Sequence, residues 1–286
     1  MRARIGWDRA FAIRGSTRSS DERAMTADLS PSAYDAFAPF YDAFTSASDY
    51  ETWTEGALAV ATRHGMRGHS LLDLACGTGK SFEPLMRRGF RVTACDASPG
   101  MLAEASFRAP EATLVHADIR DLPALGTFDL VTCFDDSLNY LAGEDELAAA
   151  FTGVALNLRA GGLALFDLNT LCAYRTTFAT DSVSEHDGVV FTWRGLGDPD
   201  AEPGCSAEAR IDVFFARADD AYERVPTRHL QRHFPRERVV ELLAATGLEC
   251  LAVHGVRSDV SLAEVADEDH HLKALYVARR AEGGDS

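Results

Sequence analysis

The chain has 286 residues, 46% of them hydrophobic and 25% charged, which is typical of a globular protein with one large domain. Its formal net charge of −16 argues against nucleic acid and membranes as partners, and fits either simple solubility or a cationic or neutral small-molecule substrate. Six cysteines without a Cys-x-x-Cys pair, and no apolar run of about 18 residues, predict a cytoplasmic protein without disulfides, metal site or transmembrane helix.

The N-terminal part predicts two segments. Residues 1–30 contain several arginines and lack the apolar core of a signal peptide, so we expect a disordered extension in which Met25 is an alternative translation start. Residues 31–68 predict an N-terminal helical lid. Within it, 32–44 and 50–65 read as short amphipathic helices, and Gly65 is a helix-stop signal.

Residues 69–170 alternate between apolar strands and helices. Near-continuous apolar strands of this kind indicate a parallel sheet that is covered on both faces. The predicted strands are 69–75, 90–96, 112–118, 128–134 and 162–168, and the predicted helices are 79–88, 98–108 and 144–158.

The pattern changes after residue 170. Residues 171–234 predict an antiparallel insertion on the substrate side, a hairpin or three-stranded patch built from 186–195, 206–217 and 221–234. Residues 235–286 predict one helix at 235–247, with Pro235 at its first position, and two last sheet strands at 248–256 and 271–279.

A glycine turn follows the first predicted strand, in the stretch "DLACGTG" of residues 73–79. A phosphate-binding Walker loop needs a glycine where this chain has Leu74. A dinucleotide fold needs a third glycine where this chain has Phe82. An acid at Asp73 is also unfavourable beside a bound anion, so the turn suits a ligand with a cationic end.

The form acid-x-x-x-Gly-x-Gly resembles the first motif of class I S-adenosylmethionine-dependent methyltransferases. "DASPGML", which begins with Asp96, and "HADIRDL", which contains Asp118, match the family in order, as does "LRAGG" before the fifth strand. The resemblance covers about residues 34–170, and more weakly the tail. It implies a Rossmann-like seven-stranded, mostly parallel sheet, with Asp96 on the ribose hydroxyls, Asp118 on the adenine amino group and Ile119 beside the ring.

The upstream stretch "YDAFAPFYDAF" resembles the lid of small-molecule N-methyltransferases of the aminosugar and glycine types. In that family the second tyrosine often reaches the cofactor carboxylate, a role that falls to Tyr41, with Trp53 as its neighbour. The alternative is an amphipathic helix whose aromatic residues form core. The cofactor-binding residues that the resemblance implies are Tyr41, Trp53, Asp73, Ala75, Gly77, Thr78, Gly79, Asp96, Ala97, Met101, Asp118, Ile119 and Phe134.

Three segments are candidates for the acceptor side: "FDDSLNYL" at 134–141, "DLNTLCAYR" at 167–175, and "RHLQRHF" at 228–234, whose alternation places His229, Gln231 and His233 on one strand face. The predicted catalytic residues are His229, His233, Asp135 and Tyr174, and the predicted substrate-binding residues are Asp136, Asn139, Tyr140, Asn169, Arg175 and Gln231. Either histidine would handle a substrate proton. The alternative is a structural or solvated role for each.

These features predict an enzyme that transfers a methyl group from S-adenosylmethionine to a small molecule, with S-adenosylhomocysteine as product. An amine acceptor is favoured by the lid resemblance and the acidic balance. Oxygen and carbon acceptors of secondary metabolism remain open, as does a homodimer. Two other classes compete: a non-catalytic cofactor-binding protein and a nicotinamide oxidoreductase.

Overall fold

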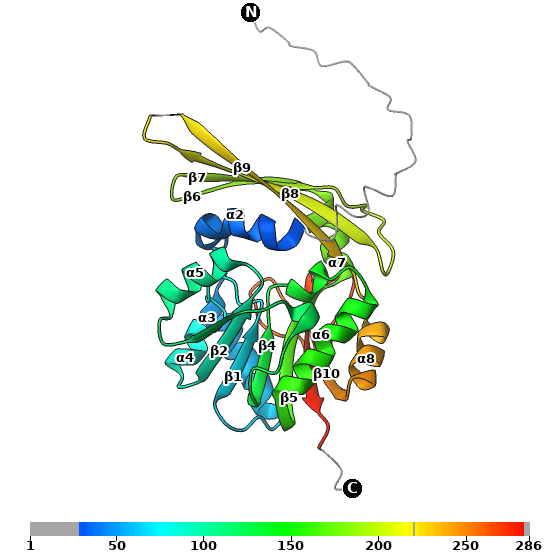
Figure 1. Cartoon of the computed structure of the whole chain (residues 1–286). Coiled ribbons are helices and arrows are strands. Elements are labelled where there is room, and N and C mark those ends of the chain that lie inside the picture. Colours follow the sequence, from blue (N-terminus) through cyan, green and yellow to red (C-terminus); the bar gives the residue numbers. More distant parts are fainter. Residues whose placement is uncertain (1–28, 220, 283–286) are drawn as a thin grey trace, which may run out of the picture.

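The computed structural model describes residues 29–219 and 221–282. Within these residues, seven strands form one sheet in the order β10-β11-β5-β4-β1-β2-β3 (Figure 1). Strands β1 to β5 run parallel, and β11 is antiparallel to both of its neighbours. The predicted Rossmann-like, mostly parallel sheet is therefore confirmed. The strands are β1 Ser70–Leu74, β2 Arg91–Asp96, β3 Thr113–His116, β4 Phe128–Cys133, β5 Leu158–Asn169, β10 Leu248–Val256 and β11 Lys273–Arg280.

Helices cover both faces of this sheet because its strands are apolar on both sides. In β1, Leu72 belongs to the core on the face covered by α6 and α8, and Leu71 to the core against α3 and α4. The α-helices are α2 Leu29–Phe44, α3 Tyr50–Arg63, α4 Glu83–Arg87, α5 Pro99–Arg108, α6 Glu144–Asn157, α7 Leu171–Arg175 and α8 Arg236–Ala245. The 3₁₀ helices are η1 Ile119–Asp121, η2 Ser137–Tyr140 and η3 Thr177–Ala179.

Four strands form a second, antiparallel sheet in the order β6-β7-β8-β9. They are β6 Asp181–His186, β7 Val189–Gly195, β8 Ser206–Ala216 and β9 Tyr222–Arg232. The prediction of at most three strands is wrong because β6 is exposed along nearly its whole length and shows no apolar alternation. Its turn to β7 is Asp187–Gly188, and both residues have positive φ, 54° and 76°. Asp-Gly is a typical hairpin sequence.

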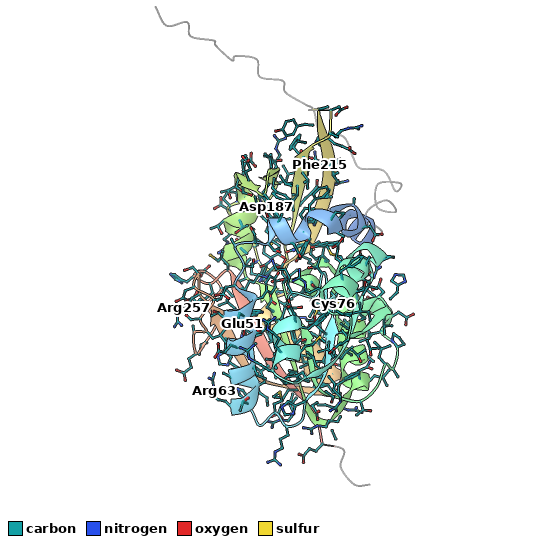
Figure 2. All side chains as sticks on the ribbon, turned by 90° about the vertical axis from the view of Figure 1, so that its left-hand side faces the viewer. Glu51, Arg63, Cys76, Asp187, Phe215 and Arg257 are labelled. Carbon is teal, nitrogen blue, oxygen red and sulfur yellow. The ribbon has the colours of Figure 1, made fainter. Side chains whose placement is uncertain are left out.

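Helix α2 lies between the two sheets (Figure 1). On one side Phe37 packs against Phe191, Ile211 and Val213 of the antiparallel sheet. On the other side the Asp35 carboxylate accepts a hydrogen bond from the backbone N–H of Gly100, at 2.9 Å, where α5 begins. Burial on one side and polar contacts on the other fix α2 above the glycine turn. Figure 2 shows Cys76 of that turn below α2, and Phe215 at the opposite end of the molecule from Arg63.

Two predicted boundaries need correction. The helix expected at 79–88 is only α4, because the chain still forms the glycine turn up to Phe82 and Pro84 then occupies the first helical turn. The fifth strand begins at Leu158, which pairs with Phe128, and continues after a register shift. The "LRAGG" stretch therefore lies inside β5.

Candidate functional site

The glycine turn connects β1 to α4. Ala75, Gly77 and Gly79 have positive φ values of 49°, 53° and 87°. A Cβ atom at Gly79 would lie 2.9 Å from Cζ of Phe82, whereas a Cβ atom at Gly77 would lie 3.9 Å from Cε1 of Tyr41. Phe82 therefore fills the space beneath the turn and makes glycine obligatory at position 79. Gly77 keeps the turn open toward Tyr41 of α2.

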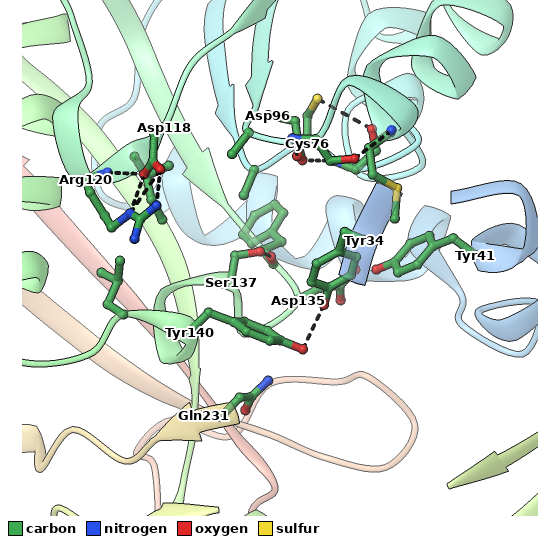
Figure 3. A pocket seen from close by; sticks show the side chains of 18 of the residues that line it. Tyr34, Tyr41, Cys76, Asp96, Asp118, Arg120, Asp135, Ser137, Tyr140 and Gln231 are labelled. Carbon is green, nitrogen blue, oxygen red and sulfur yellow. Dashed lines mark hydrogen bonds and ion pairs between the residues drawn. The ribbon is translucent and has the colours of Figure 1, made fainter. Parts of the chain in front are cut away.

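A cavity of about 440 Å³ lies between this turn, α2 and the antiparallel sheet. It is large enough for a ligand of cofactor size. In Figure 3 it extends from Asp118 and Arg120 past Asp96 to Tyr140 and Gln231. The predicted cofactor-binding residues that line it are Tyr41, Ala75, Gly77, Thr78, Asp96, Ala97, Met101, Asp118, Ile119 and Phe134.

Asp96 lies at the end of β2 and accepts two backbone hydrogen bonds, from Gly77 N–H and from Ser98 N–H, both at 2.8 Å. Burial raises the pKa of its carboxyl group, although these hydrogen bonds oppose the shift. Each carboxylate oxygen retains a further lone pair. Asp96 is therefore held rigidly and can still accept hydrogen bonds from a bound ligand.

Asp118 lies at the far end of the cavity and forms an ion pair with Arg120, with 2.5 Å between Nη2 and Oδ2. Burial raises the pKa of Asp118, but the hydrogen bonds from Arg120 outweigh it and leave the pKa below its ordinary value. Sequence reasoning missed Arg120, although it also lines the cavity. Its position two residues after Asp118 was the only signal.

Asp73 lies behind the turn instead of in the cavity wall. It is 1% exposed, and it accepts hydrogen bonds from Ser81 Oγ at 2.8 Å and from Thr132 Oγ1. Burial raises the pKa of Asp73 to about 7. Both carboxylate oxygens are engaged inside the protein, which corrects the expectation that Asp73 meets the cationic end of a ligand.

Trp53 also lies behind the main cavity. Its ring packs edge-on against Phe134, with 5.3 Å between centroids. It lines a second cavity of about 470 Å³, whose wall includes Tyr50, Asp135, Asp167 and Lys273. Tyr50 and Asp135 face both cavities. The second cavity thus adjoins the first across these two side chains.

Asp135 and Asp136 form a strained turn directly after β4. Both adopt left-handed backbone conformations, with φ of 59° and 51°. Their backbone N–H groups donate to the two oxygens of Asp167, at 2.8 and 2.9 Å. Such conformations are uncommon outside glycine and persist where the surroundings impose them. Asp167, which is 1% exposed, provides that constraint.

Lys273 joins this cluster from β11. Its Nζ lies 2.5 Å from Asp136 Oδ1, 3.0 Å from Asp167 Oδ2 and 3.7 Å from Asp135 Oδ1. Burial alone would lower the pKa of Lys273, but the three carboxylates raise it well above its ordinary value. Burial also raises the pKa of Asp167 to about 6, despite the opposing effect of Lys273. One cation therefore neutralises only part of a three-carboxylate cluster.

Tyr50 is a further residue that sequence reasoning missed. It begins α3, and its hydroxyl group donates to Asp135 Oδ2 at 2.6 Å. The Asp135 carboxylate is therefore oriented from one side by Tyr50 and lies within ion-pair distance of Lys273 on another. A carboxylate that borders both cavities is available to a cationic group in either.

The predicted substrate-binding residues divide into two groups. Tyr140 and Gln231 line the cavity. The other amides are internal, because Asn139 Oδ1 accepts from the backbone of Asn169, at 2.9 Å, and Asn169 Nδ2 donates to Gln231 Oε1, at 2.8 Å. Arg175 forms an ion pair with Asp269 outside the cavity. Asp136 binds Lys273 and Gln231 and is not among the lining residues.

Three of the four predicted catalytic residues lie away from the cavity surface. His233 is 2% exposed, and its Nδ1 accepts from the backbone N–H of Gly204 while Nε2 contacts Glu268. Tyr174 is 0% exposed and stacks on Phe178. His229, 2% exposed, lies behind Tyr140. Burial lowers the pKa of His229 to about 4. Neither histidine is therefore placed to take a proton directly from a substrate, and only Asp135 faces the cavity.

Two structural absences accompany this site. Among residues 29–219 and 221–282, no group of three or more His, Cys, Asp or Glu side chains is arranged to hold a metal ion. In the same ranges, no helix has the length and apolar character that crossing a membrane requires.

Comparison with known proteins gives one family match. The family model described as "Methyltransferase domain" matches residues 71–162. This segment runs from β1 into β5 and contains the glycine turn, Asp96, Asp118 and the Asp135–Asp136 turn.

Relatives are similar over more of the chain. A Bacillus subtilis protein provisionally named the methyltransferase YqeM is 29% identical over 84% of this chain and 94% of its own length. The dTDP-3-amino-3,6-dideoxy-alpha-D-glucopyranose N,N-dimethyltransferase of Streptomyces fradiae is 36% identical, over 42% of this chain and 47% of its own. The crystal structure of an S-adenosylmethionine-dependent methyltransferase from Clostridium acetobutylicum has a TM-score of 0.72 and 26% identity, and covers 87% of this chain and 99% of that one.

Proposed function

Since the chain is an S-adenosylmethionine-dependent methyltransferase, we propose that it transfers the methyl group to the amine nitrogen of a small molecule. The family match decides against the phosphoryl-transfer and nicotinamide interpretations of the glycine turn. The acceptor atom is the part of this proposal that rests on the geometry of Asp135.

The cavity fits the cofactor at one end. Asp96 offers carboxylate lone pairs suited to ribose hydroxyls, and Gly77 leaves the space between the turn and Tyr41 open. Asp118 and Arg120 together offer an acceptor and a donor for an adenine edge. Asp96, Gly77 and Asp118 would thus hold S-adenosylmethionine, which supplies an electrophilic methyl group on a sulfonium when it is bound.

The position of Asp135 in the cavity wall is the observation that favours an amine as the methyl acceptor. Asp135 is the carboxylate that the structure places in the cavity wall directly after β4, oriented by Tyr50 at 2.6 Å. Asp136 and Asp167 stand behind it, and Lys273 offsets only one of these three negative charges. A cationic ammonium group is attracted to such a site, and after it has released one proton to solvent the amine still donates an N–H bond to a carboxylate oxygen of Asp135.

Orientation contributes more than proton transfer in this reaction. Holding a nucleophile in line with a reacting group is worth roughly 10⁵–10⁸ M in effective molarity, whereas a general base adds about 10²–10⁴-fold. We assign orientation to the fixed walls around Asp135, which include Tyr140 of η2 and Gln231 of the antiparallel segment 171–234. The antiparallel segment thereby belongs to the acceptor side in this proposal.

The similarity to the Streptomyces fradiae enzyme supports an amine acceptor, since its name specifies N-methylation of an amino sugar. That match spans less than half of either chain. It therefore supports nitrogen as the atom that is methylated, but it does not support an amino sugar as the substrate. Glycine N-methyltransferase of Rattus norvegicus, 32% identical over 46% of this chain, also acts on a nitrogen by its name.

A release assay tests the proposal. The full chain is incubated with S-adenosylmethionine and matched pairs of metabolites that differ only in carrying an amine or a hydroxyl group. We expect S-adenosylhomocysteine release with amines, and at least a tenfold loss in Asp135→Asn. Release with the hydroxyl member of each pair and not with the amine would contradict the proposal. Asp145→Asn, a change at an exposed position in the first turn of α6, is the control.

A further inference from the structure

A chain of five polar groups runs from the cavity wall into the antiparallel sheet. The hydroxyl oxygens of Tyr34 and Tyr140 are 2.8 Å apart (Figure 3). The Tyr140 hydroxyl lies 3.0 Å from His229 Nδ1, and His229 Nε2 lies 2.9 Å from Thr227 Oγ1. The Thr227 hydroxyl lies 3.1 Å from the backbone carbonyl oxygen of Ile211.

The last member of this chain fixes the direction of every proton in it. A carbonyl oxygen only accepts, so Thr227 donates its single proton to Ile211. Thr227 Oγ1 must then accept from His229 Nε2–H. A neutral imidazole has one N–H, so Nδ1 is bare and accepts from the Tyr140 hydroxyl group. The opposite direction would leave two oxygen lone pairs facing each other between Thr227 and Ile211.

The surroundings of His229 keep it neutral. The ring is enclosed by the rings of Tyr34, Phe37 and Tyr140, at centroid distances of 5.4, 6.1 and 6.0 Å. Burial lowers the pKa of His229 to about 4, although the charge of Asp136 opposes the shift. At neutral pH the imidazole therefore has one proton, as the direction of the chain requires.

We propose that His229 and Thr227 are positioning residues that turn the Tyr140 hydroxyl proton away from the cavity, so that its oxygen presents a lone pair to the acceptor nitrogen. Tyr140 lines the cavity, whereas Thr227 and His229 do not. Tyr34 donates to the Tyr140 oxygen, so one of the two lone pairs of that oxygen is left for another donor. The amide of Gln231, whose Nε2 also donates to Asp136, lies beside this oxygen, and a bound acceptor nitrogen would take its place at the remaining lone pair.

This arrangement has a consequence for the class of acceptor, which rests on the proposed function. A nitrogen that directs its lone pair at the methyl group can donate its N–H bonds to two fixed acceptors, Asp135 and Tyr140. A primary amine satisfies both. A tertiary amine has no N–H left once it is deprotonated, and its ammonium form has one. The site therefore selects primary over tertiary amines through an oxygen that can accept but not donate.

The proton positions on His229 can be tested in the absence of any methyl-acceptor substrate. In protein labelled with ¹⁵N-histidine, long-range ¹H–¹⁵N NMR spectra distinguish protonated from bare ring nitrogens, and His229→Gln identifies the signals. We expect Nε2–H and bare Nδ1 in the wild type and in Thr227→Ser. Thr227→Val removes the acceptor of Nε2–H, so the tautomer should shift toward Nδ1–H. An Nδ1–H tautomer in the wild type, or no shift in Thr227→Val, would overturn the assignment.

The positioning role is tested with a matched pair of probes. Calorimetry in the presence of S-adenosylhomocysteine compares cyclohexylamine with N,N-dimethylcyclohexylamine. One hydrogen bond to a charged donor corresponds to about tenfold in affinity or more, so the wild type should bind the primary amine at least about tenfold more tightly. Thr227→Val should lose most of this preference, and Thr227→Ser should keep it. The affinity for S-adenosylhomocysteine should stay within about twofold in both variants.

Equal affinity for the two amines, or no binding of either, contradicts the role assigned to Tyr140. This result is distinct from failure of the proposed function. If only hydroxyl compounds are methylated while the NMR spectra show the expected tautomer, the direction of the hydrogen bonds from Tyr140 to Ile211 is confirmed. The proposal of an amine as methyl acceptor is then wrong.

Discussion

Asp96 is the residue on which cofactor recognition depends most in this account. It lines the cavity and is fixed by two backbone N–H groups. We predict that Asp96→Ala weakens S-adenosylmethionine binding by about a hundredfold, since two hydrogen bonds to a carboxylate are worth about 3 kcal/mol together. Calorimetry measures the change. Asp121→Ala, an exposed site in η1, is the control, and equal affinities of both variants would refute the assignment.

Asp73 predicts a specific pH dependence of stability. Its folded-state pKa, about 7, is above the ordinary value of 3.8. The folded state thus binds a proton that the unfolded state has released between these pH values, and the stabilising contribution present below pH 4 is lost as the pH rises to 7. Asp73→Asn should remove this slope, worth about 4 kcal/mol. Urea unfolding of both proteins from pH 4 to 8 measures it, and parallel curves would contradict the burial argument.

Residues that share a sequence motif were predictable, and residues that meet only in the fold were not. Asp96, Asp118 and the glycine turn lie in contiguous patterns, and the structure places Asp96 and Asp118 in one cavity. Lys273 and Asp167 approach the Asp135–Asp136 turn from strands far apart in sequence. No local pattern indicates such a meeting. Strand alternation places His229 and His233 on one face of β9, but it does not indicate which neighbouring side chains bury that face.

Helix α2 is the element that closes the cavity. Phe37, which is 1% exposed, attaches it to the antiparallel sheet. Removing a buried Phe side chain costs about 3 kcal/mol or more. We predict that Phe37→Ala lowers the free energy of unfolding by about this amount and also weakens S-adenosylhomocysteine binding, because Tyr41 lies on the same helix. Phe107→Ala, at a site that is 84% exposed, should change neither quantity.

A second outcome would separate the two roles of α2. If Phe37→Ala loses stability while its affinity for S-adenosylhomocysteine remains unchanged, α2 contributes only to packing. The assignment of α2 as a lid over the cofactor is then wrong. Denaturant unfolding and calorimetry on the same samples distinguish these results.

Strand and helix periodicity predicted the central sheet because its strands are apolar on both faces, which leaves few alternative arrangements. The antiparallel sheet was harder, because β6 is polar and exposed and its hairpin signal, Asp187–Gly188, was included in the following strand. Periodicity also overestimates the length of α4, because the glycine turn extends to Phe82 and Pro84 occupies the first helical turn.

The charge of the whole molecule predicts how an acceptor is recruited. A net charge of −16 surrounds a cavity with Asp135 in its wall, so a cationic amine is attracted at long range. The Debye length shortens from about 10 Å at 0.1 M salt to about 3 Å at 1 M. The KM of a cationic amine should therefore rise severalfold between 0.05 and 0.5 M NaCl. The Kd of S-adenosylhomocysteine, which has no net charge, should change little, and equal salt effects on both would contradict the prediction.

The position of the transferred methyl group tests the central claim most directly. S-adenosylmethionine labelled with ¹³C in its methyl group is incubated with the full chain and with the amines that release S-adenosylhomocysteine. The product is then examined by ¹H–¹³C NMR. We expect a labelled methyl group bonded to the amine nitrogen. A label on oxygen or carbon, or release of S-adenosylhomocysteine without any labelled product, would contradict it.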